Sequence, residues 1–470
     1  MKKNCVIAFS SLMLSCALYA QNKRMNVVFI MADDLGLNDT GYTGSDFYET
    51  PNIDKLSEEG MVFTNAYSSA ANSAPSRACF MSGMYTPRHG IFTVSPPDRG
   101  DRTKRKLIPI PNVEDLRKDI PTMGELFKRN GYRCGHVGKW HLGDDEDGTG
   151  PLSRGFDVNV AGGRAGTPYS YYYPYCNNKG MCHIGLEKGK QGEYLTDRLT
   201  DEAVAFIKES AHGEKPFFLY LAHHAVHTPI TAPKSIVDKY EKKAKGKYHT
   251  NSVYAAMVET LDNSVGKICG IIDSLGISDN TIIIFNSDNG GSEPITDNYT
   301  VRGGKGMPYE GGNRVPLIVK WPDVTKAGGV SDCPVNNIDF FSTFQMYLEG
   351  KIGDELDGAD IYPLLNNEKS SIERDLFWHF PAYLESYTDN GKGFRAKPYT
   401  SVRSGKWKLI YYYENENTEL FDLDKDPLEE HDLSCVNKEI AAVLKKKIFD
   451  WIKEVNAPVP TELNPYYEGD

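Results

Sequence analysis

The chain of 470 residues has few cysteines, no internal repeat, no low-complexity segment and no excess of basic residues. Its nine cysteines include no Cys-x-x-Cys pair of the kind that binds zinc. Lys and Arg number 53 against 64 Asp and Glu, a formal net charge of -11, which argues against non-specific nucleic-acid binding. An anionic substrate would therefore need a local pocket of positive charge. With 40% hydrophobic residues, a chain of this length can bury a sizeable core, and we expect a large domain and a smaller one.

The N-terminus has the layout of a secretory signal peptide. Two lysines precede an apolar run that ends in small residues at Ala20, and the run is too short for a membrane span. We therefore expect residues 1–20 to be removed on export across the inner membrane, with the mature protein in the periplasm. Lipid attachment at Cys16 is disfavoured because Met13 stands where Leu is usual. A buried first strand or helix is the alternative.

Loss of Cys5 and Cys16 with the signal peptide would leave seven cysteines, an odd number from which no complete disulfide framework follows. Cys176 and Cys182 are close enough in sequence to bridge in a secreted protein. The others are typical of core packing.

Short apolar runs alternate with amphipathic stretches over the first three quarters of the chain. The runs are typical of strands buried on both faces of a parallel sheet and lie at residues 26–31, 217–221, 281–285 and 315–319. Apolar spacings of three and four predict helices at residues 53–60, 123–130, 197–210 and 253–275. This alternation predicts a large α/β domain over residues 25–365, with a mostly parallel central sheet flanked by helices.

The pattern changes after about residue 365. Residues 406–413 and 418–422 predict a hairpin of antiparallel strands, and residues 438–455 predict a helix. We therefore expect a small α+β domain over residues 366–470 that carries an antiparallel sheet and completes the substrate pocket.

Acidic side chains follow two of the predicted strands. Asp33 and Asp34 come after the first strand, and Asp288 and Asn289 come after the strand at 281–285. Ligands bind at the carboxyl ends of strands in an open parallel sheet, so three carboxylates and one amide oxygen should converge there. Such hard oxygen ligands suit Ca²⁺ or Mg²⁺. Either pair alone is better explained as a turn or a helix cap, but the two together favour a metal site.

Several other residues have both a structural and a functional interpretation. Ser73, in the stretch ANSAPSRACF, is by itself best interpreted as a helix N-cap. Lys139 and His141 lie two apart, on one side of an extended segment. His227 follows a predicted strand, and Lys305 lies in a glycine-rich loop that permits close approach to a ligand. Taken singly, such lysines are usually solvated and such histidines usually structural.

Motifs spread from residue 26 to about residue 433 together carry a family resemblance. They are NVVFIMADDLG, TPNIDKLSEEG, SAPSR, SGMYTPRHG, GYRCGHVGKWHLG, PFFLYLAHHAVHTP, TIIIFNSDNGG, GGKGMPYEGGNRVPLIV, LDGADIYPLL, GKWKLIYYY and ELFDLDKDPLEEHDL. Each is weak alone, but the set in this order is specific. The chain resembles the formylglycine-dependent sulfatases of the alkaline-phosphatase superfamily, in their serine-type, bacterial secreted form. The resemblance implies an alkaline-phosphatase-like catalytic domain and the hydrolysis of sulfuric esters.

Within this resemblance, Ser73 occupies the position that the family oxidises to Cα-formylglycine, whose aldehyde forms a hydrate. One hydroxyl would attack sulfur and the alcohol would leave, after which deprotonation of the other hydroxyl would expel sulfate. An unmodified serine could complete only the first half and would stay trapped as a sulfate ester. The serine form resembles enzymes matured by an anaerobic radical sulfatase-maturing enzyme, which would recognise residues 75–77.

The resemblance also implies a ligand set for Ca²⁺, with Mg²⁺ as the other candidate. Asp33, Asp34, Asp288 and Asn289 match the family's metal ligands. The oxygen of modified Ser73 and the substrate sulfate would complete the shell.

The remaining roles fall on cations and histidines. Arg77 and Lys139 match residues that hold the formylglycine and neutralise charge, and His141 matches the group that deprotonates the hydrate. His227 would protonate the leaving alcohol, and Lys305 would grip the sulfate together with Lys139 and His227. These cations would supply the local positive charge that the acidic chain needs.

Two segments, residues 161–190 and 377–394, do not match the general family pattern, so substrate identity is expected to depend on them. Aromatic residues beside His379 would stack on a sugar ring, and His379 would contact the sugar. The predicted substrate is therefore a sulfated carbohydrate. The alternative for Trp378 and Phe380 is packing between domains.

Two other functions remain open at this point. The first is a phosphomonoesterase, phosphodiesterase or phosphonate hydrolase of the same superfamily. A two-metal phosphatase would need a second set of ligands, and His223, His224 and His227 have no clear partners in the sequence. The second is a glycan-binding protein that keeps the cleft but is not modified at Ser73.

Overall fold

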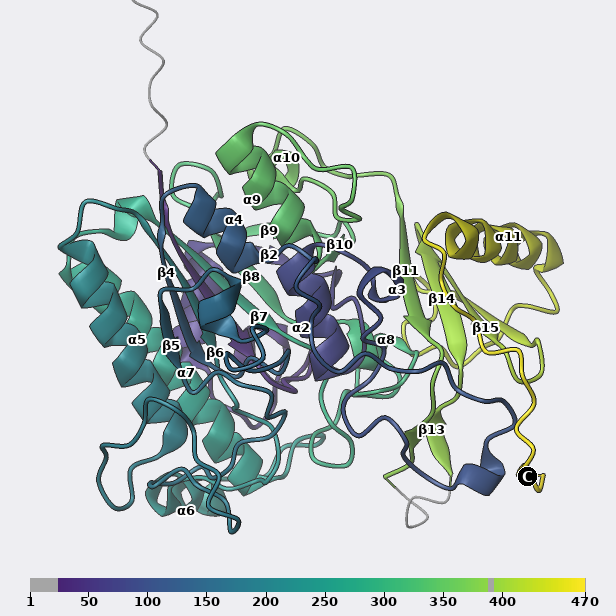
Figure 1. The fold of residues 1–470 in the computed structure, drawn as a ribbon, viewed down its shortest axis with the longest axis horizontal. Coiled ribbons are helices and arrows are strands. Elements are labelled where there is room, and N and C mark those ends of the chain that lie inside the picture. Colours follow the sequence, from purple (N-terminus) through teal and green to yellow (C-terminus); the bar gives the residue numbers. More distant parts are fainter. Residues whose placement is uncertain (1–23, 388–392, 470) are drawn as a thin grey trace, which may run out of the picture.

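The computed structural model of the protein describes residues 24–387 and 393–469 (Figure 1). The predicted signal peptide, residues 1–20, and the alternative lipid site Cys16 lie outside these residues. Among the described residues, no helix is both long enough and apolar enough to span a membrane.

An eight-stranded sheet forms the centre of the larger part of the molecule, with the strand order β5-β4-β6-β1-β7-β8-β2-β9. The strands are β1 (Asn26–Ala32), β2 (Met61–Phe63), β4 (Arg133–Gly138), β5 (Val158–Val160), β6 (Phe217–Ala222), β7 (Thr281–Ser287), β8 (Leu317–Lys320) and β9 (Gly329–Ser331). Neighbouring strands are parallel except where β8 pairs with β7 and with β2. The prediction of a mostly parallel central sheet is confirmed.

Helices cover both faces of this sheet (Figure 1). Along β1, Val27, Phe29 and Met31 enter one hydrophobic core, whereas Val28 and Ile30 enter the other. The first core is covered by α2 (Ser73–Ser82), α4 (Met123–Arg129) and α9 (Asp339–Glu349), and the second by α1 (Pro51–Glu59), α5 (Leu195–Ala211) and α7 (Ser252–Ser274). Side chains of β1 alternate between two apolar layers, which explains the continuous hydrophobic run in the sequence. Four of these helices, α1, α4, α5 and α7, agree with the predicted ones within about two residues.

A second sheet follows in the C-terminal part, and it is antiparallel. Its order is β11-β14-β15-β16, with β11 (Asp375–Phe380), β14 (Tyr399–Ser404), β15 (Trp407–Tyr412) and β16 (Thr418–Asp422). Helix α11 (Lys438–Glu454) packs on β14 and β15 (Figure 1). The predicted hairpin, helix and antiparallel C-terminal sheet are confirmed. A domain boundary near residue 365 stays a prediction.

Further short strands and helices complete the fold. They are β3 (Ala66–Tyr67), β10 (Val335–Asn336), β12 (Leu384–Glu385), β13 (Phe394–Ala396), α3 (Thr86–His89), α6 (Lys234–Lys242), α8 (Glu310–Asn313) and α10 (Tyr362–Leu365). Strands β12 and β13 pair as an antiparallel ladder of their own. Cys176 and Cys182 form a disulfide, and the other cysteines in the described residues are free.

Candidate active site

The acidic residues that follow β1 and β7 meet at one edge of the central sheet. The two strands are parallel neighbours, and their last paired residues are Ala32 and Ser287. The backbone N–H of Asp34 donates to Asp288 Oδ1 at 3.2 Å, and Asn289 Nδ2 donates to Asp34 Oδ1 at 2.8 Å. The structure thus brings the two predicted acidic pairs into direct contact.

Ser73 reaches the same point from the start of α2. Its Oγ donates toward Asp33 Oδ1 at 3.1 Å and toward Asn289 Oδ1 at 3.2 Å, and only 1% of the residue is exposed. The interpretation of Ser73 as the N-cap is wrong by one residue, because Asn72 holds the extended N-cap backbone and Ser73 is already helical. The Ser73 hydroxyl is therefore turned toward the acidic oxygens instead of capping the helix.

Three cations pair with the three carboxylates: Arg77 and Lys139 are buried, and the side chain of Lys305 is 11% exposed. Arg77 Nε donates to Asp288 Oδ2 at 2.9 Å, Lys139 Nζ to Asp33 Oδ2 at 2.7 Å and Lys305 Nζ to Asp34 Oδ2 at 2.8 Å. The side chains of Arg77, Lys139 and Asp33 are at most 1% exposed. We call these six residues the catalytic cluster: Asp33, Asp34, Asp288, Arg77, Lys139 and Lys305. Its charges balance, which lets them be buried together.

Neighbouring charges keep Asp34 and Lys305 of this cluster ionised. Burial alone would raise the pKa of Asp34, but Lys305, His227 and Lys139 together hold it well below its ordinary value. Burial opposes ionisation of Lys305 too, yet Asp34 and Asp33 raise its pKa above the ordinary value. Lys305 therefore offers a fixed positive charge to an anion that enters the site.

His141 lies beside this cluster with an unusual backbone. Its φ of 63° is left-handed, so the prediction of an extended segment is wrong at this residue. A Cβ added at Gly166 would lie 2.3 Å from His141 Nε2, so the ring rests against the Gly166 backbone. His141 Nδ1 is buried without a hydrogen-bond partner. Burial and the nearby Lys139 hold its pKa well below the ordinary value, which keeps the imidazole neutral and able to accept a proton.

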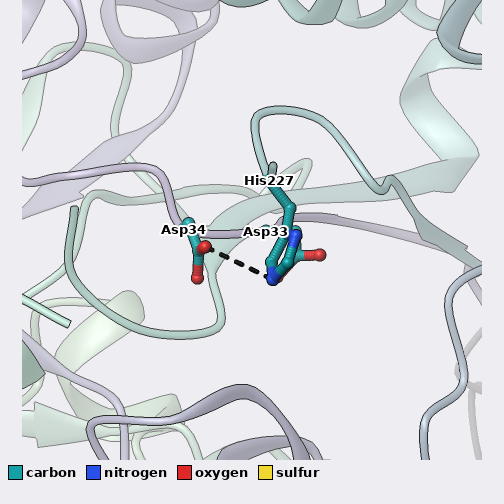
Figure 2. Close-up of side chains that lie close together, drawn as sticks. All are labelled: Asp33, Asp34 and His227. Carbon is teal, nitrogen blue, oxygen red and sulfur yellow. Dashed lines mark ion pairs between the residues drawn. The ribbon is translucent and has the colours of Figure 1, made fainter. Parts of the chain in front are cut away.

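His227 faces Asp34 across the site. Figure 2 shows the two side chains pointing toward one another, with His227 Nε2 3.7 Å from Asp34 Oδ2. His227 Nδ1 lies 2.7 Å from the carbonyl oxygen of Thr228, which can only accept, so Nδ1 carries a proton and Nε2 faces the acidic oxygens. Burial and Lys305 lower the pKa of His227 to about 3.

The oxygens of this site fit a divalent cation. Asp33, Asp34 and His227 offer ligand atoms within 4.8 Å of one another (Figure 2). The oxygens of Asp33 and Asn289 also converge on Ser73 Oγ at 3.1 and 3.2 Å. A set dominated by carboxylate and amide oxygens is typical of Ca²⁺ and Mg²⁺.

A cavity of about 460 Å³ opens above these residues. It is lined by Asp34, Ser73, His141, His227 and Lys305 from the predicted site, and by further residues that include Arg99, Arg164, Glu293, Glu385, Tyr387 and Arg395. The sequence segments 161–190 and 377–394 both contribute to this lining. Arg99, Glu293 and Arg395 were not predicted, because none of them lies in a motif.

Family comparison decides what kind of site this is. A sequence profile described as Sulfatase matches residues 25–349, and one described as N-sulphoglucosamine sulphohydrolase, C-terminal, matches residues 304–454. The chain belongs to the sulfatase family. It is therefore a hydrolase of sulfuric esters, as its motifs predicted.

Several known sulfatases align with nearly the whole length of this chain. A sulfatase of Formosa agariphila is 31% identical over 93% of this chain and 90% of its own length. The N-acetylgalactosamine-6-sulfatase of Mus musculus is 31% identical over 90% of this chain and 84% of its own. The crystal structure of Ps i-CgsB in complex with k-i-k-neocarrahexaose superposes with a TM-score of 0.76 at 30% identity, covering 94% of this chain and 95% of that one.

His379 lies outside the cavity of this sulfatase, contrary to the prediction that it binds substrate. Its Nδ1 lies 2.7 Å from Thr400 Oγ1 and its Nε2 lies 2.9 Å from the carbonyl oxygen of Pro458. Trp378 Nε1 donates to the Ser68 carbonyl at 2.7 Å, and the residue is 2% exposed. Packing, which was the alternative interpretation for Trp378, describes that side chain, and the ring nitrogens of His379 are likewise already bonded within the protein.

His223 and His224 do not build a second metal centre beside the first. His223 Nε2 lies 2.8 Å from Ser264 Oγ, and neither nitrogen of His224 has a hydrogen-bond partner. Across residues 24–387 and 393–469, the other group of three side chains with ligand spacing is Asp426, Glu430 and His431, in the C-terminal part. The described residues thus offer a single buried centre, unlike a two-metal phosphatase.

Proposed function

We propose that this sulfatase removes sulfate from a sulfated carbohydrate, with Ser73 converted to Cα-formylglycine and a Ca²⁺ ion held by Asp33, Asp34, Asp288 and Asn289. Mg²⁺ is the alternative ion. The observation that carries the proposal is the position of Ser73 Oγ, which lies between Asp33 Oδ1 and Asn289 Oδ1 at the base of the cavity. Two relatives support a sugar substrate: one is an N-acetylgalactosamine-6-sulfatase, and one was crystallised in complex with k-i-k-neocarrahexaose.

When bound, the metal would supply a Lewis acid, and the hydrated aldehyde would supply a nucleophilic hydroxyl and a second hydroxyl whose deprotonation would release sulfate. Arg77 and Lys139 pair with Asp288 and Asp33 beside position 73, and they would hold the modified side chain and neutralise charge there. Lys305 lines the cavity with its ammonium and is placed to bind sulfate oxygens.

Two histidines divide the proton transfers. His141 is neutral and has a free Nδ1, so it suits the base that takes the proton of the hydrate. His227 is assigned to protonation of the leaving alcohol, because Nε2 faces the site while Nδ1 is fixed by the Thr228 carbonyl. A bound sulfate ester would offset the positive charge of Lys305 and so favour the protonated form of His227.

We also propose that the chain is exported to the periplasm after cleavage behind Ala20 and is matured by an anaerobic radical sulfatase-maturing enzyme. The Cys176–Cys182 disulfide supports an oxidising compartment.

The test is turnover of a panel of singly sulfated monosaccharides by protein purified from its native host. We expect release of sulfate from at least one sugar and a loss of about 10⁴-fold or more in Ser73→Ala, because the nucleophile is removed. Calcium binding, measured by calorimetry, should persist in that variant.

The matched control is Ser82→Ala, at the other end of the same helix, where Ser82 Oγ donates to the carbonyl oxygen of Ala78 at 2.7 Å. It should keep its activity within about 3-fold of wild type. Retained turnover in Ser73→Ala would sink the assignment of the nucleophile.

A further inference from the structure

Among the described residues, most charges that line the catalytic cavity are in ion pairs, and the exceptions are Glu293 and Arg395. Four of its lining residues are cations, and three of them have carboxylate partners: Lys305 with Asp34 at 2.8 Å, Arg99 with Glu385 at 3.5 Å, and Arg164 with Asp115, Asp144 and Asp147 at 2.6 to 3.1 Å. The fourth, Arg395, forms no ion pair with any carboxylate in the described part of the chain. Arg395 is therefore the one cation of the cavity lining that has no carboxylate within ion-pair distance among the described residues.

Arg395 is held in place although it has no counter-ion. Its guanidinium carbon lies 3.7 Å from the centroid of the Tyr387 ring, in a cation–π contact. Its Nε is buried without a hydrogen-bond partner, and burial lowers the pKa of the side chain. An arginine keeps its proton even so, and a partly buried cation without a partner is unfavourable. Such a group is stabilised when a ligand brings the missing anion.

The surroundings of Arg395 place it next to the sulfate-binding end of the cavity. A Cβ added at Gly306 would lie 2.7 Å from Arg395 Nε, so this nitrogen touches the residue that follows Lys305. On the other side, Ser292 Oγ donates to the Tyr387 hydroxyl at 3.1 Å. Ser292 stands three residues after Asn289, in the loop that carries the proposed metal ligands. Arg395 thus contacts the loop that carries Lys305, and Tyr387 contacts the loop that follows the proposed metal ligand Asn289.

The carboxylates of the cavity do not compete for this guanidinium. Asp34 and Glu385 already pair with Lys305 and Arg99, and Glu293 forms no ion pair with Arg395. Within residues 24–387 and 393–469, no carboxylate lies at ion-pair distance from Arg395 to compete with an anion of the substrate.

We propose that Arg395, stacked on Tyr387, binds a second anionic group of the substrate, so that the preferred sugar carries a carboxylate or a further sulfate beside the scissile sulfate ester. This inference rests on the proposed function and deepens it. A guanidinium can donate two parallel hydrogen bonds to either kind of anion, which gives orientation as well as affinity. Lys305 and Arg395 would then hold two anionic groups of one substrate in neighbouring subsites.

The experiment compares three sugars that share the same scissile sulfate: one with no other charge, one with an added uronate carboxylate, and one with a second sulfate. We expect wild-type kcat/KM for one of the two doubly charged sugars to exceed that of the singly charged sugar by about 10-fold or more. Arg395→Gln should shrink this preference to within about 3-fold. The sugar that shows the preference identifies the anion as carboxylate or sulfate.

The matched control is Arg164→Gln, which removes an arginine of the same cavity that is already paired with aspartates. It should change kcat/KM for all three sugars by the same factor. Binding to the Ser73→Ala protein, measured by calorimetry, repeats the comparison without turnover, and the doubly charged sugar should bind about 10-fold more tightly in an Arg395-dependent way.

The outcomes separate this inference from the proposed function. Turnover of the singly charged sugar with no preference for either doubly charged sugar would overturn the second-anion site and leave the sulfatase mechanism intact. A preference that persists in Arg395→Gln would overturn it as well. If no sugar is turned over, the binding comparison still decides the role of Arg395, whereas the proposed substrate class fails.

Discussion

Two buried charge clusters of this molecule look alike in composition and differ in what surrounds them. The catalytic cluster borders a cavity. The second, which we call the interface cluster, joins the central sheet region to the C-terminal sheet and consists of Tyr67, Glu310, Arg403, Lys408 and Glu429.

In the interface cluster, the ammonium of Lys408 is enclosed by two carboxylates. Lys408 Nζ, on β15, lies 3.0 Å from Glu310 Oε1 and 2.9 Å from Glu429 Oε1. The Tyr67 hydroxyl donates to Glu310 Oε2 at 2.6 Å, and Arg403 in turn donates to Tyr67. The side chains of Lys408, Glu310 and Glu429 are at most 1% exposed. Buried ion pairs thus mark a functional site only where they border a space that a ligand can enter; elsewhere they hold parts of the fold together.

The largest expected effect belongs to the interface cluster. Lys408→Met should lower the free energy of unfolding by about 3–5 kcal/mol, because two carboxylates lose their buried counter-ion. Urea unfolding measures this, and kcat/KM per folded molecule should stay within about 3-fold of wild type. Lys406→Met is the matched control: its pair with Asp422 is partly exposed, so about 1 kcal/mol or less should be lost. Equal losses of unfolding free energy in the two variants would show that burial of the Lys408 pairs adds no stability.

Lys305→Met removes a lysine from the catalytic cluster, and we expect it to affect activity more than stability. We expect kcat/KM to fall about 10²- to 10³-fold, because a cation placed for the sulfate oxygens is removed. The free energy of unfolding should change by only about 1 kcal/mol, since Asp34 borders the cavity and water can reach it. Lys234→Met, in an exposed pair with Asp238, should alter neither quantity. A stability loss in Lys305→Met as large as that in Lys408→Met would contradict the distinction between the clusters.

The interface cluster should also make stability depend on pH. Burial and Glu310 raise the pKa of Glu429 from 4.5 to about 7, although Lys408 opposes the shift. The folded state therefore binds this proton more tightly than the unfolded state, and the stability from it is present below pH 4.5 and lost as the pH rises through about 7.

In urea unfolding, the free energy of unfolding of the wild type should be about 1–3 kcal/mol lower at pH 8 than at pH 5. Glu429→Gln should not show this decrease. The glutamine variant keeps the hydrogen-bonding shape but cannot titrate. The same pH dependence in both proteins would assign the effect to other groups.

The smallest effect concerns the wall of the cavity. Gly166→Ala would place a Cβ 2.3 Å from His141 Nε2, so the ring must move. We expect kcat to fall about 10-fold with a minor change in stability, because a small misplacement of a catalytic group is enough. Gly270→Ala, where an added Cβ meets nothing within 4 Å and the backbone has no positive φ, controls for the substitution itself. Full activity of Gly166→Ala would exclude a role that depends on the position of His141.

Much of the fold could be predicted because its strands and helices have strong periodic patterns. The run before Asp33 is apolar throughout since β1 faces two hydrophobic cores, and this pattern places its end at the site. The order of the strands could not be predicted from periodicity, because pairing depends on contacts far apart in sequence. The antiparallel direction of β8 is an example: its apolar run resembles those of the parallel strands.

The candidate site was predictable where its residues lie in motifs and not where they lie on irregular loops. Ser73, Asp33, Asp34, Asp288 and Asn289 meet as expected, since strand ends and the start of a helix determine their places. His379 was misassigned because its environment, with Thr400 and Pro458 bonded to its ring, comes from distant segments. Arg395 was missed for the same reason, as only the folded chain shows which arginines have carboxylate partners.

Mass spectrometry of the peptide that contains Ser73, from protein purified from its native host, tests most directly whether this serine becomes the nucleophile. Protein from that host is required because another host need not contain the maturing enzyme. The expected result is a peptide lighter by two hydrogen atoms, with an aldehyde that reacts with hydrazine reagents at position 73. An unmodified serine in protein that still turns over a sulfated sugar would contradict the formylglycine mechanism, and an unmodified serine without turnover would favour a glycan-binding protein.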